Sequence, residues 1–337
     1  MKQSYTIILI LLTCFEIVNG QVVNVKTKSV NPNDSVVVRL NNYIGDLQWQ
    51  KSSDSINWLD VDHATLDTLL IVADQNRWLR ALVNAGNCEP FISDMLKIIV
   101  KPILYDSVSD IDGNIYKTIT YGEQEWMAEN LRVTRYADGT LIPLVANESE
   151  WGKLQDNNTD RAYCWYLNDS ASYSQTYGAL YTWAAATNGE SDATNPNGVQ
   201  GACPAGWHIP GDAEWTELED YLIANGYNYD GSILGNKVGK SLATKTGWYL
   251  DRTAGNVGCD PQSNNISGFS AFPSGARDLD YGTFVAEGID CFWWSSTERS
   301  EFLVYIRILT HRYPNLYRGL NYKSNGFCVR CVKDREN

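Results

Sequence analysis

The sequence predicts a β-sandwich followed by an α+β domain. Up to residue 101, short apolar segments alternate with Asn, Asp, Gly and Ser, as strands alternate with turns. Lys101-Pro102 then interrupts the last segment, because proline cannot donate a hydrogen bond to a strand ladder. From residue 103 to residue 334 the composition changes, and most tryptophans and glycines lie there. We therefore expect domains at residues 21–101 and 103–334.

The first twenty residues have the features of a secretory signal peptide. Lys2 precedes an apolar run from Ile7 to Phe15, and the segment ends at Gly20. We expect cleavage before Gln21 and export to the cell surface or the medium. A lipid anchor on Cys14 is less favoured, because Thr13 stands where a smaller residue is usual.

The charge composition argues against two classes of binding partner. The chain of 337 residues has 27 basic and 40 acidic side chains, a formal net charge of -13, and no run rich in Lys or Arg. We therefore expect no binding to nucleic acid or to anionic membranes. After the first twenty residues, no stretch approaches the roughly 20 apolar residues of a membrane helix, so we expect no transmembrane segment.

Export would place the cysteines in an oxidising compartment, where disulfides are the usual state. Besides Cys14, the chain has seven cysteines, at positions 88, 164, 203, 259, 291, 328 and 331. Because seven is odd, at least one has no partner within the chain. Cys88 is the natural candidate for a free thiol, since it is far from the other six in sequence.

The first domain has strand-like segments of similar length, at 35–40, 47–52, 68–72, 77–83 and 94–100. Trp49 within a strand and the spacing of Asp74, Asn76 and Trp78 resemble an immunoglobulin-like (Ig-like) domain. In that family a cysteine usually stands where this chain has Arg80, so the resemblance implies a core without the intersheet disulfide. The run ALVNAGNCEP resembles Ig-like modules of secreted Bacteroidetes-type proteins.

The second domain opens with a predicted hairpin. Asp112-Gly113-Asn114 lies between two extended segments and is typical of a tight turn. Asp110, Asp112 and Asn114 also alternate like the first ligands of a calcium-binding EF-hand. However, Ile115 and Tyr121 stand where that motif needs glycine and glutamate, so we expect a turn and no calcium site.

The segment CPAGWHIPGDAEW, residues 203–215, leads into a predicted helix. Trp215, Leu218 and Leu222 form one apolar face, and Asn225-Gly226 ends the helix. We interpret its acidic residues as a solvated face; they are Asp212, Glu214, Glu217, Glu219 and Asp220.

We expect His208 to be structural, because the other histidines, His63 and His311, lie far away in sequence and form no zinc motif with it. We predict no catalytic residue, no cofactor and no metal site.

Several sequence blocks resemble the Fibrobacter succinogenes major paralogous (FISUMP) domain over residues 103–334. They are DIDGNIYKTITYGEQEWMAENL, YGALYTWAAA, CPAGWHIPGDAEWTELEDYL, GFSAFPSGAR, WWSST and GFCVRCVKD. This family belongs to secreted and surface proteins of Bacteroidetes and Fibrobacteres. The resemblance therefore implies an extracellular module.

A more distant likeness concerns the fold. WHIPGDAEW and GFCVRCV are similar to the helix entry and closing strand of formylglycine-generating sulfatase-modifying enzymes, which have a C-type-lectin-like fold. The analogy implies a bridge between Cys203 and Cys331, and such a long closed loop would strongly restrict the unfolded chain. The pairing of Cys164, Cys259, Cys291 and Cys328 stays unassigned.

The first functional hypothesis is a non-enzymatic module that binds an extracellular glycan or protein. Aromatic rings stack on sugars and fill partner pockets. The candidate ligand surface consists of Arg277, Asp278, Tyr281, Trp293 and Trp294.

The alternative is a copper- or thiol-dependent oxidase like the sulfatase-modifying enzymes, which would need a closely spaced pair of thiolates. Cys328-x-x-Cys331 has that spacing. In an expected strand, however, residues three apart point to opposite faces, which favours two separate disulfides.

Overall fold

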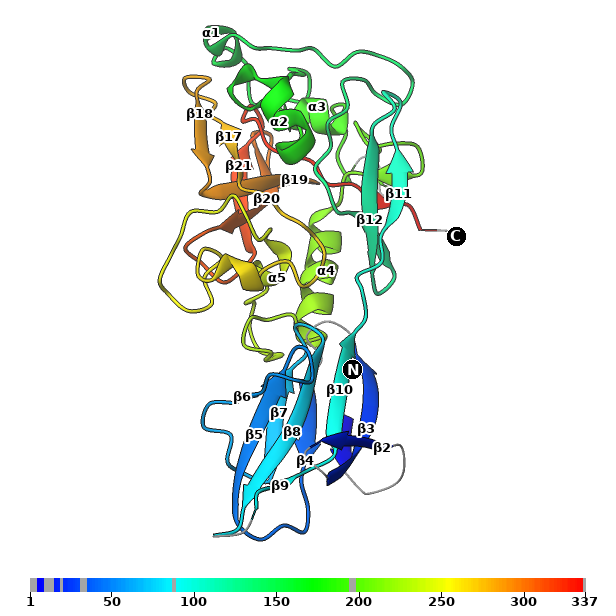
Figure 1. Ribbon diagram of the computed structural model, residues 1–337. Coiled ribbons are helices and arrows are strands. Elements are labelled where there is room, and N and C mark those ends of the chain that lie inside the picture. The colour runs from blue at the N-terminus through cyan, green and yellow to red at the C-terminus, as the bar shows by residue number, and fades with distance from the viewer. Residues whose placement is uncertain are drawn as a thin grey trace. The chain divides into compact units, whose positions relative to one another are not determined.

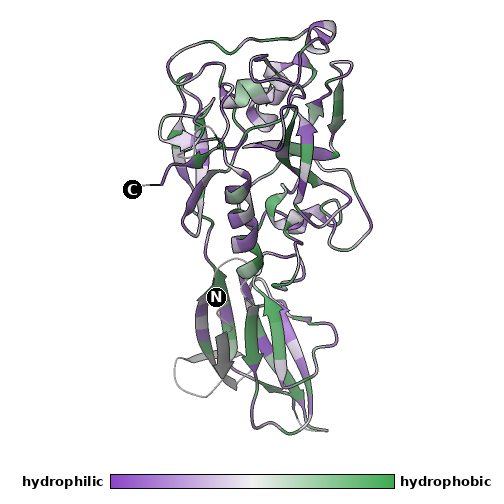
Figure 2. Ribbon diagram, turned by 180° about the vertical axis from the view of Figure 1, so that it is seen from behind, coloured by the Kyte–Doolittle hydropathy of each residue, from purple (hydrophilic) through white to green (hydrophobic). Residues whose placement is uncertain are grey.

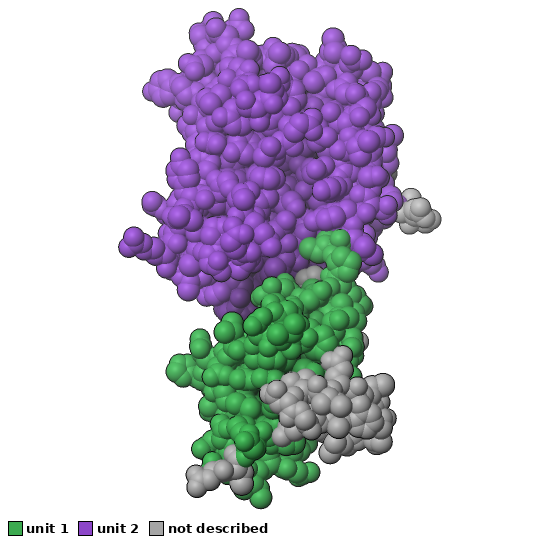
Figure 3. Space-filling view, in the orientation of Figure 1, with its two compact units in different colours: residues 1–103 green, residues 104–337 purple. Residues whose placement is uncertain are grey.

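The computed structural model describes residues 5–8, 15–18, 21–30, 35–86, 89–193 and 198–335. The chain forms two compact units, residues 1–103 and 104–337, and their boundary lies beside the predicted linker (Figure 3). Both units are rich in β-structure (Figure 1). Among the described residues, no helix has the length and apolar character needed to cross a bilayer. Cys14 and Cys88 lie outside the described residues.

The described residues of the first unit form two sheets. The three-stranded sheet has the order β1 (Tyr5–Ile8), β4 (Ser35–Arg39), β7 (Thr68–Val72). The larger sheet has the order β2 (Phe15–Val18), β3 (Gln21–Val30), β10 (Met95–Val100), β8 (Arg77–Asn84), β5 (Asp46–Ser52), β6 (Leu59–Asp60), with β9 (Phe91–Ile92) beside β8. The five strands predicted from sequence are confirmed, each end within one residue.

One hydrophobic core joins these two sheets. Val36 and Val38 of β4 and Trp49 of β5 are completely buried in the same cluster, because alternate residues of each strand face inward. The indole nitrogen of Trp49 donates a hydrogen bond to the backbone oxygen of Leu66 at 2.8 Å. In Figure 2 the strands of this unit carry many hydrophobic residues, which are drawn in green. The two sheets therefore pack face to face.

In the second unit, the part of the chain that the structure describes forms three sheets and short helices. One sheet has the order β11 (Asp106–Ser109), β12 (Ile115–Tyr121), β13 (Gln124–Met127), β22 (Val332–Lys333), β16 (Trp207–His208). The next pairs β14 (Tyr163–Cys164) with β15 (Leu180–Tyr181). The third has the order β18 (Phe284–Glu287), β17 (Ser274–Arg277), β19 (Asp290–Glu298), β20 (Leu303–Thr310), β21 (Tyr317–Tyr322).

The helices of this unit are α1 (Glu148–Trp151), α2 (Ser170–Tyr177), α3 (Trp183–Thr187), α4 (Asp212–Ala224) and α5 (Gly239–Leu242). Two single 3₁₀ turns, η1 (Tyr166–Asn168) and η2 (Pro261–Ser263), lie in its loops. The described part of this unit is thus rich in β-structure, with a few short helices, which is compatible with the expected α+β domain.

Helix α4 forms and ends as predicted. The carboxylate of Glu214 accepts a hydrogen bond from the backbone N–H of Gly211 at 2.9 Å and so caps the first turn. Gly226 follows the helix with φ of 78°, a conformation that favours glycine. Trp215, Leu218 and Leu222 are fully buried, which confirms the predicted apolar face.

The acidic face of α4 is only partly solvated, because Asp212, Glu214 and Glu219 are half-buried, so the prediction is wrong for these three residues. Arg307 of β20 is completely buried and contacts Glu219 at 2.6 Å and Asp212 at 2.7 Å. Arg318 of β21 adds a second contact to Asp212 at 2.7 Å. The sheet thus supplies the cations that allow these carboxylates to be partly buried.

The predicted hairpin forms between β11 and β12. The carboxylate of Asp110 accepts hydrogen bonds from the side chains of Asn114 at 2.8 Å and Tyr116 at 2.6 Å. Asp112 accepts from the backbone N–H of Thr134 at 2.6 Å. These carboxylates therefore stabilise the turn and its neighbour, which agrees with the interpretation as a turn.

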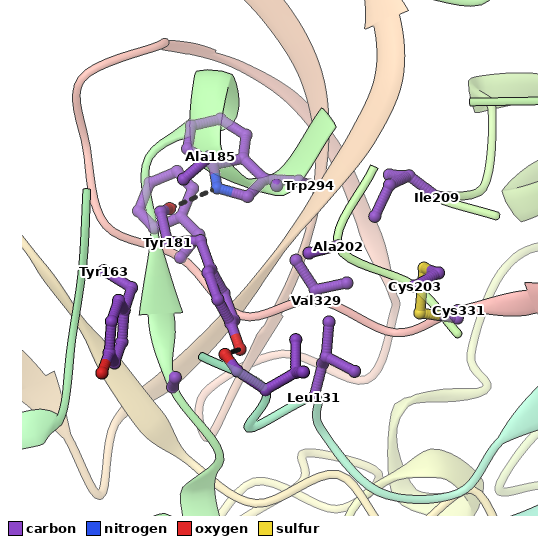
Figure 4. Close-up of a cluster of buried hydrophobic side chains, with 14 of the residues drawn as sticks. Leu131, Tyr163, Tyr181, Ala185, Ala202, Cys203, Ile209, Trp294, Val329 and Cys331 are labelled. Carbon is purple, nitrogen blue, oxygen red and sulfur yellow. Dashed lines mark hydrogen bonds between the residues drawn. A yellow bond between two sulfur atoms is a disulfide. The ribbon is translucent and has the colours of Figure 1, made fainter. Parts of the chain in front are cut away.

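The C-terminal residues 326–333, here called the closing segment, run through the core of the second unit. Phe327 exchanges two backbone hydrogen bonds with Tyr181 of β15. The backbone oxygens of Val329 and Cys331 accept from Leu131 and Met127. Residues 327–332 are all buried, and Figure 4 shows Val329 and Cys331 among the core side chains. The closing segment is therefore a buried interior segment, and its residues 332–333 form β22.

A disulfide anchors the closing segment. Cys203 and Cys331 are bonded, 128 residues apart in sequence, which confirms the predicted pair. The bond links the loop before β16 to the segment that carries β22 (Figure 4). Because it closes such a long loop, it removes much conformational freedom from the unfolded chain.

Removal of this disulfide should destabilise the second unit. We expect Cys203→Ala/Cys331→Ala to lower the free energy of unfolding by about 2–5 kcal/mol, measured by urea denaturation. Cys164→Ala is the matched control, since Cys164 is equally buried but has no disulfide partner in the structure. An equal loss in both variants would show that packing, and not the covalent link, stabilises this region.

Candidate functional site

The two tryptophans of the predicted ligand surface lie in the core. Trp293 and Trp294 are completely buried. Their indole nitrogens donate to Asn130 Oδ1 at 3.0 Å and to the backbone oxygen of Tyr181 at 2.7 Å. The physical reason is that β19 is an interior strand, paired with β17 and β20 and joined to Cys328 of the closing segment. The prediction that they contact a ligand is therefore wrong.

Arg277 is also buried, so its assignment to a ligand surface is wrong as well. Its guanidinium donates to the backbone oxygens of Gly282, Val145 and Ala146 at 2.7–2.9 Å. The same group lies over the ring of Trp151 at 4.6 Å. Arg277 therefore holds three chain segments together and has no donor group facing solvent.

The remaining two residues lie at the surface. Tyr281 is 76% exposed, and Asp278 is half-buried. The carboxylate of Asp278 accepts from the backbone N–H groups of Asp280 and Tyr281 and so shapes the loop between β17 and β18. The structure thus leaves an exposed tyrosine in a turn, without the aromatic surface that the sequence predicted.

A different concave site lies in the second unit and was not predicted from the sequence. The pocket has a volume of about 350 Å³. Its lining residues are Lys117, Ala128, Glu129, Asn130, Gln175, Thr176, Thr244, Lys245, Thr246, Asn265, Ser270, Phe272 and Arg330. They come from β12, the segment after β13, α2, two loops and the closing segment. No single stretch of sequence carries the site, which explains why sequence reasoning missed it.

Arg330 of the closing segment forms the inner wall of this pocket. It is 1% exposed and donates hydrogen bonds to the side chain of Asn130 and to the backbone oxygens of Met127, Phe269 and Ser270. Burial lowers the pKa of Arg330 to about 10. At neutral pH the pocket therefore contains a fixed positive charge whose described hydrogen bonds go to uncharged oxygens.

The rim of the pocket carries further charge and hydrogen-bonding groups. Lys117 and Lys245 are exposed, as are Gln175 and Thr176 of α2. Among the described lining residues, Glu129 is the single carboxylate, and it accepts a hydrogen bond from the backbone N–H of Lys117. Within an acidic chain, this pocket is locally positive. It offers amides, hydroxyls and one half-buried ring, that of Phe272.

Two unpaired cysteines lie near the same wall. The Sγ atoms of Cys291 and Cys328 are 3.1 Å and 3.0 Å from the hydroxyl oxygen of Ser274, and both residues are completely buried. Burial raises the pKa of the Cys328 thiol far above its usual value. Cys164 is also buried, which raises its pKa to about 11, whereas Cys259 is half-buried. In the structure all four are thiols.

His208 has two acidic partners. Its Nδ1 lies 2.7 Å from Asp334 and its Nε2 lies 2.9 Å from Glu214. Burial alone would lower the pKa of His208, but these carboxylates outweigh it and raise the pKa above 6.5. Within the described parts of the chain, no three His, Cys, Asp or Glu residues are grouped to bind a metal. His208 thus joins α4 to the C-terminal residues.

The charge on His208 should make stability depend on pH. Because its folded pKa is raised, its stabilising contribution is complete below the unfolded value of 6.5 and is lost as the pH rises through the folded pKa. We expect His208→Gln to lower the free energy of unfolding more at about pH 6 than at about pH 9. Urea denaturation of both proteins across this range measures the difference, and a gap that is independent of pH would contradict the ion pairs.

Comparison with protein families identifies the second unit. The model described as the Fibrobacter succinogenes major domain matches residues 119–333. Residues 19–102 match a domain of unknown function, DUF8696. Among curated proteins, the comparison found no match. The first match covers more than half of the 337 residues and confirms the resemblance drawn from the sequence blocks. The chain therefore belongs to the Fibrobacter succinogenes major domain family.

Proposed function

We propose that this chain is an exported bacterial surface protein whose second unit is a non-enzymatic module that binds a carbohydrate. The observation that carries the proposal is the pocket around Arg330, which combines amide and hydroxyl side chains with the ring of Phe272. Pockets that bind small molecules typically combine such convergent polar groups with apolar or aromatic surface. In this proposal the first unit is an Ig-like spacer and the second has a C-type-lectin-like fold.

The charge of the pocket favours an acidic carbohydrate over a neutral one. The pocket has three positive charges, from Lys117, Lys245 and Arg330, and one negative charge, from Glu129. A carboxylated or sulfated sugar would pair with the exposed lysines, while its hydroxyl groups would meet Gln175 and Thr176. A face of the sugar ring would stack on Phe272.

Export rests on the N-terminal sequence pattern. Cleavage before Gln21 would remove β1 and β2, and β3 begins at Gln21 itself. The larger sheet would then keep β3 paired with β10 at its edge. N-terminal sequencing of the exported protein should begin at Gln21. An N-terminus at a lipid-modified Cys14 would instead show an anchored protein.

The cysteine geometry gives little support to the alternative, a copper- or thiol-dependent oxidase. Such an enzyme needs neighbouring thiolates that substrate and metal can reach. Cys331 is bonded to Cys203, so Cys328 and Cys331 do not form a dithiol. Cys328 and Cys291 are completely buried.

A binding experiment tests the proposal. We expect the full chain without its signal peptide to bind uronate-containing or sulfated oligosaccharides on a glycan array, and to bind neutral ones more weakly. Lys117→Gln/Lys245→Gln should weaken that binding about tenfold, as expected for the loss of two exposed ion pairs. The affinity should also fall with salt. Calorimetry with the best oligosaccharide measures both effects.

Lys153→Gln is the matched control, because Lys153 is exposed and does not line the pocket. Equal losses in the control and the double variant would place the binding site elsewhere. The absence of carbohydrate binding, or binding to host proteins alone, would contradict a carbohydrate module.

A further inference from the structure

The thiols of Cys291 and Cys328 meet at one side chain. The hydroxyl oxygen of Ser274 lies within hydrogen-bond distance of both sulfur atoms, at 3.1 Å and 3.0 Å. All three residues are completely buried. Both sulfurs therefore contact the same oxygen atom in the interior of the second unit.

The strand register explains why these two side chains converge. Cys328 lies opposite Trp293 in a parallel bridge, and its backbone N–H donates to Phe292 at 3.1 Å. Cys291 precedes Trp293 by two residues on β19, so it shares that face of the sheet. Side chains at such diagonal positions can reach each other across neighbouring strands.

Other pairings are disfavoured among the cysteines that the structure describes. Cys331 is already bonded to Cys203. Cys164 lies beside Arg277. Cys259 is only half-buried, in the loop before η2, whereas Cys291 and Cys328 are completely buried. Within the described residues, Cys291 and Cys328 are thus the unpaired cysteines that share a contact.

We propose that Cys291 and Cys328 form a second structural disulfide, which links β19 to the closing segment. The two thiols lose two protons and two electrons as the S–S bond forms. The oxidant is a disulfide, either of a thiol–disulfide oxidoreductase or of a small molecule, whose own S–S bond takes up both electrons and both protons and becomes two thiols.

This bond must form before folding is complete. Both sulfurs have no exposed surface in the folded unit, so an oxidant can reach them only while the closing segment is not yet packed. Together with Cys203–Cys331, the second bond would fix the closing segment at two positions three residues apart.

Peptide mapping tests the proposal on the unmodified chain. The protein is isolated after export to an oxidising compartment. It is denatured in acid without reductant, its free thiols are alkylated, and it is digested to peptides. We expect a cross-linked peptide that contains Cys291 and Cys328, with Cys164 and Cys259 alkylated. A bond from either residue to another cysteine overturns the proposal, and so does alkylation of both residues in protein shown to be exported.

A second experiment tests the pairing without relying on export, because the first one needs the oxidising compartment that export would provide. Reduced, unfolded chain without its signal peptide is refolded in oxidised and reduced glutathione and mapped in the same way. Formation of the cross-link there supports the pairing even if the protein is not exported in its host. Its absence in both experiments refutes the pairing whatever the location of the protein.

Stability provides an independent readout. In the Cys203→Ala/Cys331→Ala background, dithiothreitol should shift the urea midpoint downward, because a second disulfide remains. The addition of Cys291→Ala/Cys328→Ala should abolish that shift, whereas Cys164→Ala should leave it unchanged. A midpoint that does not respond to reductant in this background would refute the bond.

Discussion

The second unit depends on the burial of its closing segment. A backbone that passes through a core must satisfy its N–H and C=O groups, and unpaired groups there cost about as much as lost hydrogen bonds. The closing segment meets this requirement through partners that are far apart in sequence, including Leu131, Tyr181 and Phe292. Its side chains also complete the core around Trp294, and Cys331 adds a covalent link. The unit therefore assembles only when its end has packed against its beginning and its middle.

Buried arginines bring positive charge into the interior of the second unit. Arg307 is neutralised by carboxylates of α4. Arg277 and Arg330 instead direct their donors mainly at backbone oxygens, so each ties several loops together. A planar guanidinium suits both arrangements because its donors are fixed in direction. Arg330 belongs to the closing segment and also lines the pocket, so the segment that completes the core also contributes a buried positive charge to the proposed binding site.

Local patterns predicted much of the fold. The five sandwich strands, the hairpin at Asp112 and helix α4 follow from periodicity and turn residues, which act within a few positions along the chain. The Cys203–Cys331 pair came from a resemblance between families. Burial of Trp293, Trp294 and Arg277 depends on which strands flank β19, and a single sequence does not reveal that. The acids of α4 were misjudged for the same reason, since Arg307 lies about ninety residues away.

The pocket could be predicted from the sequence even less well than the burial of these residues. Its lining includes both Lys117 and Arg330, so the site is complete only when the closing segment is packed. Native-state hydrogen exchange tests this dependence most directly. The amides of Leu131, Tyr181, Trp294 and Phe327 should exchange with one common free energy, equal to that of global unfolding of the second unit. Exchange of these amides at a clearly lower free energy than those of α4 would show that the closing segment detaches while the rest of the unit stays folded.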